Sequence, residues 1–285
     1  MIRKGHHNGS SYWYCKTCNR YSQGIFTIKE LSQEFNISAS TVKRILRNYT
    51  VTKVAHTPGK VVVQMDTTYW GRNFGLVLFM DAATHHILHH FFIRGKERIE
   101  DYKQGLAYLE HLGWEVAGVV ADGLSGLKNS LIQTPYQYCQ FHQAQRIRQL
   151  LTLKPRMLAA QELQRIVSRL TQSNRSEFAH LLEDWRERWD DFLKEKTYEE
   201  NGVNFHYTHR KLRAAHRSLK EHLDQLFTYQ DFPMGVMPNT NNAVESFNSW
   251  LKRKLQLHPG LSPARRETLI SNLIMAYNHR SRKGT

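Results

Sequence analysis

The sequence predicts an α/β fold, in which a mixed β-sheet is covered by helices and interrupted by an all-helical insertion. Three short strands follow one another over residues 61–93, and an alternation of helix and strand continues to residue 154. An antiparallel meander followed by β-α-β units gives a mixed sheet. The chain has 285 residues, 40% of them hydrophobic, and is therefore long enough to bury the core of such a fold.

The strands are predicted from β-branched and apolar runs that end at turn residues or aspartates. The first run ends at Asp66, the second at Asp81 and the fourth at Asp122. We expect strands at 61–65, 74–80, 86–93, 116–121 and 136–139, with helices at 97–112 and from His142. Because polar side chains follow the strands, a functional site is expected where the strands end.

Asp66 and Asp122 are the expected centre of that site. If the first and fourth strands are neighbours, their carboxylates lie side by side, which is costly unless a divalent cation lies between them. Mg²⁺ is the usual ion, and Mn²⁺ can replace it. Two such ions bridged by carboxylates support in-line displacement at phosphorus. The pattern therefore predicts phosphoryl-transfer chemistry, with a third carboxylate completing the metal site.

Glu245 is the expected third carboxylate, because it follows an Asn-rich turn and lies in the first turn of a helix. The helix dipole would help to keep it ionised. Alternatively, Glu245 only caps the helix, because Asn242 and Glu245 have the spacing of a capping box. Asp81 is a rival for the role at the sheet edge, but we expect it to open a turn with Ala82 and Ala83 instead.

Residues 155–230 are predicted to be helical throughout. Apolar residues from Phe178 to Phe192 recur at helical spacing, which predicts one long helix, and those from Leu212 to Phe227 predict another. After the turn at 233–238, one helix follows the Asn-rich segment and a last helix begins at Pro263.

The positive charge of the chain gathers at its two ends. The formal net charge is +15, of which residues 1–60 carry +8 and residues 231–285 carry +5. Such a distribution is typical of a protein that binds a polyanion such as DNA. A basic protein without a nucleic-acid partner is the alternative.

Residues 27–47 have the pattern of a helix-turn-helix module. Thr27 with Glu30 and Ser38 are start signals for two short helices, and Asn36 can adopt the left-handed turn between them. The expected inner faces are formed by Leu31, Phe35, Val42, Ile45 and Leu46. The second helix would present polar side chains suited to phosphates and base edges, namely Ser40, Thr41, Lys43, Arg44 and Arg47. A small helical hairpin without DNA-binding activity is the alternative.

Cys15 and Cys18 form a Cys-x-x-Cys knuckle between aromatic residues, as in half of a zinc ribbon. The odd count of three cysteines argues against a disulfide scaffold. A closed Zn²⁺ site needs four ligands, so His6, His7, a partner chain or residues preceding Met1 would have to complete it.

Two other groups of residues have side chains that can bind a metal ion. Cys139 and His142 could be half of a metal site, but we favour a buried cysteine and a hydrogen-bonding histidine. The histidines at 85, 86, 89 and 90 lie on both faces of one strand, so they are expected to flank it rather than share a metal.

The chain has no run of about 18 apolar residues, and its polar, His-rich beginning is unlike a signal peptide. We therefore expect a cytoplasmic protein with no membrane partner.

Four motifs, in order, resemble those of the bacterial Mutator-type insertion-sequence transposases. They are Met-Asp66-Thr-Thr-Tyr-Trp, Val-Val-Ala-Asp122-Gly-Leu, Tyr138-Cys139-Gln-Phe-His142 and Asn241-Asn242-Ala-Val-Glu245-Ser. The helical segment before Glu245 also resembles the insertion of this family. The N-terminal region is similar to the zinc-ribbon and helix-turn-helix module of one branch, although the first Cys pair is missing. The resemblance covers nearly the whole chain.

The resemblance implies an RNase H-like mixed five-stranded sheet with helices on both faces. It implies a DDE triad of Asp66, Asp122 and Glu245 that holds two Mg²⁺ ions, with Mn²⁺ as a substitute. Cys139 and His142 would be a family motif of unclear role. Water and then a DNA 3′-hydroxyl would attack phosphorus.

The partners implied are double-stranded DNA, as element ends and target, and further copies of the chain in a dimer or larger assembly. The N-terminal module would recognise the terminal inverted repeats, and basic side chains near the C-terminus would grip phosphates: Lys252, Arg253 and Lys254. The protein would lie in the bacterial cytoplasm and associate with the nucleoid when bound to DNA.

We expect six segments, which are a partial zinc-ribbon-like knuckle (1–22), a helix-turn-helix module (23–50), a linker (51–60), the first part of the catalytic core (61–154), the helical insertion (155–230) and the Glu-bearing and C-terminal helices (231–285). Two alternatives remain. The chain could be a sequence-specific DNA-binding protein or repressor derived from an inactive transposase, or an RNase H-like nuclease of repair or recombination. Dependence on a metal ion separates the repressor from the two enzymes.

Overall fold

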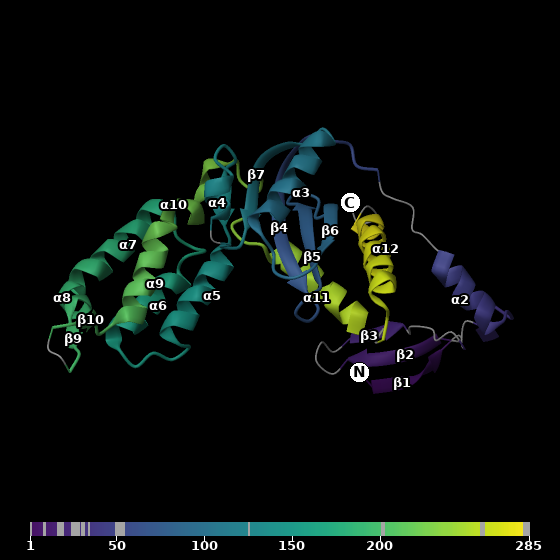
Figure 1. The fold of residues 1–285 in the computed structure, drawn as a ribbon, viewed down its shortest axis with the longest axis horizontal. Helices are drawn as coiled ribbons and strands as arrows, with labels where there is room; N and C mark the ends of the chain where they lie inside the picture. The colour runs from purple at the N-terminus through teal and green to yellow at the C-terminus, as the bar shows by residue number, and fades with distance from the viewer. Residues whose placement is uncertain are drawn as a thin grey trace. The chain divides into compact units, whose positions relative to one another are not determined.

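The computed structural model describes residues 2–7, 10–15, 20–23, 29, 32–33, 35–48, 55–124, 126–200, 203–256 and 260–281. Of 2–23, 46–48 and 280–281 only the backbone is described. The chain divides into two compact units, Met1–Lys53 and Val54–Thr285 (Figure 1). The boundary between them falls inside the linker expected at 51–60.

The first unit contains a three-stranded antiparallel sheet that the sequence analysis did not predict. Its strands are β1 (Ile2–His7), β2 (Ser10–Cys15) and β3 (Arg20–Gln23), in that order across the sheet. Residues 16–19 of the expected knuckle, and the side chains of Cys15 and Cys18, lie outside the described residues. The expected zinc site therefore stays a prediction.

Helix α2 (Ala39–Asn48) begins where the sequence predicts. The backbone N–H of Thr41 donates to Ser38 Oγ at 3.1 Å, so Ser38 caps the helix, and Asn36 has the expected left-handed backbone with φ 49°. Val42 is buried, but Phe35 and Ile45 are 63% and 50% exposed, so the expectation that both face inward is wrong. Thr27, Glu30 and Leu31 lie outside the described residues.

The second unit is built on a five-stranded mixed sheet with strand order β6-β5-β4-β7-β8, as the sequence predicts in coarse outline. Strands β4, β5 and β6 pair antiparallel, whereas β4, β7 and β8 pair parallel. The strands span Lys60–Tyr69 (β4), Gly75–Asp81 (β5), Ile87–Ile93 (β6), Glu115–Ala121 (β7) and Tyr136–Tyr138 (β8).

Helices cover both faces of this sheet. Val77 and Phe79 of β5 share an apolar cluster with α3 (Ile99–His111), and the alternate residues Leu76 and Leu78 pack with α11 (Asn242–Gln256) and α12 (Pro263–Ser281). Because both faces are buried, β5 is apolar throughout instead of alternating with polar residues. The start of α12 at Pro263 confirms the prediction.

Helix α3 approaches the sheet closely at a glycine. A Cβ atom added to Gly105 would lie 1.9 Å from Phe79 Cζ, which is too close for two carbon atoms that are not bonded to each other. The absence of a side chain at Gly105 thus sets the distance between α3 and β5.

A mainly helical region lies between β8 and α11. It packs against the sheet through one continuous apolar cluster, to which Ile147 and Leu151 of α5 contribute. Its helices, with the short α4 that precedes β8, are α4 (Leu127–Ser130), α5 (Gln140–Leu151), α6 (Leu158–Ser168), α7 (Arg175–Arg188), α8 (Asp190–Lys194), α9 (Arg210–Glu221), α10 (Leu223–Leu226) and the 3₁₀ turn η1 (Thr228–Asp231).

Three expectations for this region are wrong. The second expected helix, from Leu212 to Phe227, is divided, because α9 ends at Glu221 and His222 leaves helical geometry (φ −102°, ψ 6°) before α10. The region is also not helical throughout, because β9 (Lys196–Tyr198) and β10 (Phe205–Tyr207) form a short antiparallel hairpin. The expected long helix also ends at Arg188, where Trp189 leaves helical geometry (φ −107°, ψ 16°). The indole N–H of Trp189 donates to Glu162 at 2.8 Å, and the turn allows α8 to bury Leu193.

Candidate functional site

Asp66 and Asp122 lie level with each other on adjacent parallel strands. The last paired residues of β4 and β7 are Gln64 and Val120, and each aspartate follows its partner of that pair by two residues. The condition stated for the site, that the first and fourth strands are neighbours, is therefore met. Side chains two residues apart on a strand point to the same face, so the register puts the two aspartates at matching positions, where the charge of Asp122 acts on Asp66.

Asp66 does not end its strand, which corrects the prediction. Beyond Asp66, β4 continues to Tyr69, paired with β5, whereas its pairing with β7 stops at Gln64. The apolar run ends at Met65 because the neighbouring parallel strand ends near there. Asp66 therefore lies within β4, at a position where β4 still pairs with β5 but no longer pairs with β7.

Burial and neighbouring acids change the ionisation of Asp66. Its side chain is half-buried, and the amide of Asn248 donates to its Oδ2 atom at 2.6 Å. Burial is the largest cause that raises its pKa, to about 7, and the charge of Asp122 follows. Glu245 and Glu97 add smaller contributions in the same direction, and a hydrogen bond from the backbone N–H of Thr67 opposes them.

Asp122 is the first residue after β7, and its environment is similar. Burial raises the pKa of its carboxyl, Glu97 and Glu245 raise it further, and His142 lowers it. Tyr136 donates its hydroxyl to the Asp122 carbonyl oxygen. A Cβ atom on Gly123 would lie 2.0 Å from Tyr138 Oη, so only glycine permits this loop to pass so close to Tyr138.

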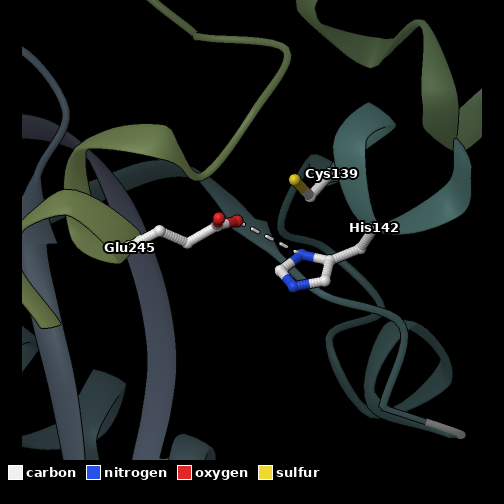
Figure 2. Close-up of side chains that lie close together, drawn as sticks. All are labelled: Cys139, His142 and Glu245. Atoms are coloured by element: carbon white, nitrogen blue, oxygen red, sulfur yellow. Dashed lines mark ion pairs between the residues drawn. The ribbon is translucent and has the colours of Figure 1, made fainter. Parts of the chain in front are cut away.

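Glu245 extends from the first turn of α11 towards α5. Its Oε1 atom lies 3.6 Å from His142 Nδ1 (Figure 2). The helix begins at Asn242, and the backbone N–H of Glu245 bonds to the Asn241 carbonyl at 3.0 Å. Asn242 is thus already inside the helix, and its spacing from Glu245 is not that of a cap and its partner. The capping-box alternative is therefore not supported.

Cys139 and His142 join Glu245 in one cluster (Figure 2). One ligand atom from each of the three residues lies within 4.8 Å of the other two. Cys139 Sγ is buried and accepts the backbone N–H of Asn241 at 3.2 Å, and burial raises the pKa of its thiol. The interpretation of Cys139 as a buried cysteine is confirmed, but His142 Nδ1 has no hydrogen-bond partner within the described part of the chain.

The turn at Asn239–Asn241 holds these elements together. Gln140 N–H donates to the Asn239 carbonyl at 3.0 Å, which ties α5 to the turn. Gln64 Nε2 donates to the Thr240 carbonyl at 3.0 Å, and Asn241 Nδ2 donates to the Met65 carbonyl at 2.7 Å, which ties it to β4. The Asn-rich motif therefore positions the site through its amides as well as through Glu245.

Glu97 and Asn248 were missed from the sequence. Tyr102 donates its hydroxyl to Glu97 Oε2 at 2.6 Å, and Glu97 donates its backbone N–H to Tyr69 Oη at 2.7 Å. These bonds hold Glu97 where its charge acts on both aspartates. No motif marks Glu97. Asn248 has a sequence signal, because it is a polar residue on the helix face that carries the apolar positions 247 and 251, and that face of α11 is buried.

The remaining predicted acids and ligands lie elsewhere. Asp81 Oδ1 accepts the N–H of Ala83 at 2.9 Å and Oδ2 accepts the Thr84 hydroxyl at 2.5 Å, which confirms the turn. His89 packs on Tyr108 of α3, and His90 lies 3.2 Å from Ser271 Oγ of α12. These two histidines lie on opposite faces of β6, as expected.

The predicted DNA-binding residues lie on helices α2 and α11. Ser40, Lys43 and Arg44 are exposed and Thr41 is half-buried on α2, whereas the Arg47 side chain lies outside the described residues. On α11, Lys252 and Arg253 are exposed and Lys254 is half-buried.

The donor set of the site is rich in oxygen. Asp66, Asp122 and Glu245 offer carboxylates. Burial first, and then the charges of neighbouring acids, raise the pKa of Asp66 and Asp122, and a bound cation would offset both effects. Comparison with known proteins adds no assignment, because no family model matches the chain and no curated protein matches it. Among the helices that the structure describes, none has the length and apolar character needed to cross a membrane.

Proposed function

We propose that the chain is a bacterial insertion-sequence DNA transposase that uses Asp66, Asp122 and Glu245 for metal-dependent strand cleavage and strand transfer. One observation carries the proposal. Two aspartates lie level on adjacent parallel strands, and both have a pKa raised by burial and by Glu245. Such a group of acids is what a pair of divalent cations needs for phosphoryl transfer.

The topology supports the proposal. A sheet with three antiparallel strands followed by two parallel ones, in the order β6-β5-β4-β7-β8, agrees with the RNase H-like sheet implied by the resemblance. The first aspartate lies on the central strand, the second follows β7, and the glutamate lies on α11, which packs against the sheet beyond the helical region.

The acids fit Mg²⁺ better than a softer ion, because hard carboxylate oxygens are the ligands this ion prefers. When bound, two such ions would supply an activated attacking oxygen and stabilise the leaving oxygen. Asp66, Asp122 and Glu245 would hold them. Asn248 would keep Asp66 in one orientation, and Tyr102 would do the same for Glu97, so that the charges are placed before DNA binds.

The substrate under this proposal is double-stranded DNA. The exposed Ser40, Lys43 and Arg44 of α2 would contact the element ends, and Lys252 and Arg253 of α11 would contact phosphates. Cutting and joining two ends implies at least a dimer. The chain would act in the bacterial cytoplasm, associated with the nucleoid.

The test is cleavage of DNA fragments that carry the sequences flanking the gene. We expect cleavage with Mg²⁺ or Mn²⁺, none with EDTA, and a loss of at least about a thousandfold in Asp122→Ala with end binding retained. The exposed Glu110→Ala of α3 is the matched control and should cleave normally. Binding that is specific but never followed by cleavage, in any divalent cation, would favour the repressor alternative. Cleavage without any preference for the ends would favour a repair or recombination nuclease.

A further inference from the structure

The cluster of Cys139, His142 and Glu245 differs in chemistry from the aspartate pair beside it. It combines a thiol, an imidazole and a carboxylate, one ligand atom of each lying within 4.8 Å of the others (Figure 2). Sulfur and imidazole nitrogen are ligands for Zn²⁺ and similar transition-metal ions, whereas Mg²⁺ prefers oxygen alone. The proposed function leaves this sulfur and nitrogen unused.

Local structure places the three groups in advance of any ligand. Cys139 is the N-cap residue of α5, and His142 lies in the first turn of that helix. The two residues are three positions apart, so their side chains are neighbours on one side of the helix start. The bond from Asn241 N–H to Cys139 Sγ, and that from Gln140 N–H to the Asn239 carbonyl, fix α5 against the chain that leads into α11. The position of Glu245 relative to the other two is thus set by the backbone.

Two atoms of the cluster lack hydrogen bonds although they are buried. They are His142 Nδ1 and Glu245 Oε1, which lie 3.6 Å apart and have no hydrogen-bond partner among the described residues. Buried polar atoms in folded proteins are rarely left so, because an unsatisfied polar group destabilises the folded state. A cation between the two atoms would satisfy both.

The size of the cluster also suits one ion. Ligand atoms bound at about 2.0 to 2.3 Å around a tetrahedral ion lie about 3.5 Å from one another. The separations of up to 4.8 Å between the three ligand atoms exceed this spacing by little more than one ångström at most. Three protein ligands would leave the fourth position open.

We propose that Cys139, His142 and Glu245 form a binding site for one transition-metal ion of the Zn²⁺ class, separate from the Asp66 and Asp122 carboxylates. The site goes beyond the proposed function and does not require it. Glu245 is common to both sets of ligands, so occupation of this site would compete with the aspartates for that carboxylate.

The experiment uses Co²⁺, whose thiolate complexes have a near-ultraviolet charge-transfer band that complexes with oxygen ligands lack. The full chain carrying Cys15→Ser and Cys18→Ser is titrated without DNA, so that Cys139 is the sole remaining thiol. We expect one equivalent of Co²⁺ to produce the band, Zn²⁺ to remove it, and excess Mg²⁺ to leave it unchanged.

Variants then identify the ligands. Cys139→Ser should abolish the band, and His142→Ala and Glu245→Gln should each weaken Co²⁺ binding by at least about tenfold. His180→Ala, on the exposed side of α7, is the matched control and should bind as the parent does. Circular dichroism shows whether each variant is folded. If Cys139→Ser does not fold, His142→Ala tests the site instead.

Absence of the thiolate band in the folded parent would overturn the proposal, as would a band that survives Cys139→Ser. Because the spectrum is read without DNA and without turnover, its failure would leave the proposed transposase activity standing. Conversely, a chain that never cleaves DNA could still show the band.

Discussion

The side-chain amide of Asn248 donates a hydrogen bond to Asp66 Oδ2 at 2.6 Å. Asn248 lies three residues after Glu245 on α11, so the two residues are neighbours on successive turns of that helix. One bond thus fixes the helix that carries the glutamate against the strand that carries the first aspartate, and it also restricts the orientation of the Asp66 carboxylate.

Replacing Asn248 should therefore impair activity more than it impairs DNA binding. In Asn248→Ala, Asp66 loses a donor to its charged form and Glu245 loses an anchor, so we expect DNA cleavage to fall by about 10- to 100-fold. The neighbouring exposed Ser249→Ala is the control. Cleavage rates and gel-shift affinities measured together would separate the effects. Equal losses in the two variants would show that the bond is not needed.

The raised pKa of Asp66 predicts a pH-dependent stability. Between about pH 4 and pH 7 the folded chain keeps a proton that an ordinary carboxyl with pKa 3.8 has lost. The folded state then binds more protons than the unfolded state, so the free energy of unfolding falls as pH rises through this window. Without divalent cations we expect a decrease of about 1 to 3 kcal/mol.

Urea unfolding in EDTA at pH 5 and pH 8 measures this decrease. Asp66→Asn should remove most of it and should be more stable than the parent at pH 8. Asp184→Asn, an exposed site on α7, should leave it unchanged. Millimolar Mn²⁺ should restore the stability of the parent at pH 8 but not that of Asp66→Asn. Identical pH profiles for Asp66→Asn and the parent would refute this account.

Glu97 should contribute to cation affinity although it belongs to none of the motifs. Its charge raises the pKa of both aspartates, so Glu97→Gln should lower both values and make the site less attractive to cations. We expect Mn²⁺ binding, measured by calorimetry, to weaken several-fold. Glu100→Gln makes the same change of net charge at an exposed position of α3. A similar loss in both variants would mean that only the overall charge matters.

Gly105→Ala should destabilise the fold, although alanine normally favours a helix by about 1 kcal/mol. The added Cβ would lie 1.9 Å from Phe79 Cζ, and separating α3 from β5 should cost about 1 to 3 kcal/mol. Gly59→Ala, where no atom lies within 4 Å of the added Cβ, should be nearly neutral. Thermal unfolding of both variants gives the comparison, and a stabilised Gly105→Ala would contradict the packing argument.

Much of the sheet was predictable because its strands are continuous apolar runs. Residues such as Val63 and Leu78 are buried on the two faces that helices cover, and this burial produces the β-branched and apolar runs on which the prediction depends. The pattern did not fix the pairing of the first and fourth strands, which entered the prediction only as the condition under which Asp66 and Asp122 would lie side by side. Glu245 near both was expected from its place in a polar helix start.

Other features depend on contacts that local patterns do not reveal. The hairpin β9–β10 has three-residue strands with mostly exposed side chains, so it shows no alternation. The break at Trp189 depends on a bond to Glu162, 27 residues away, and Glu97 is placed by Tyr69 and Tyr102. These residues came together only when the sheet and helices were assembled.

The bond from Asn241 to the Met65 carbonyl spans 176 residues of sequence. Contacts of this separation form late, since the intervening chain must first exist and collapse. During synthesis, the ribosome releases β4, β7 and α5 well before α11 emerges. A nascent chain, or one truncated before Asn241, therefore holds both aspartates without the turn that orders them, and the carboxylate site is complete only in the finished protein.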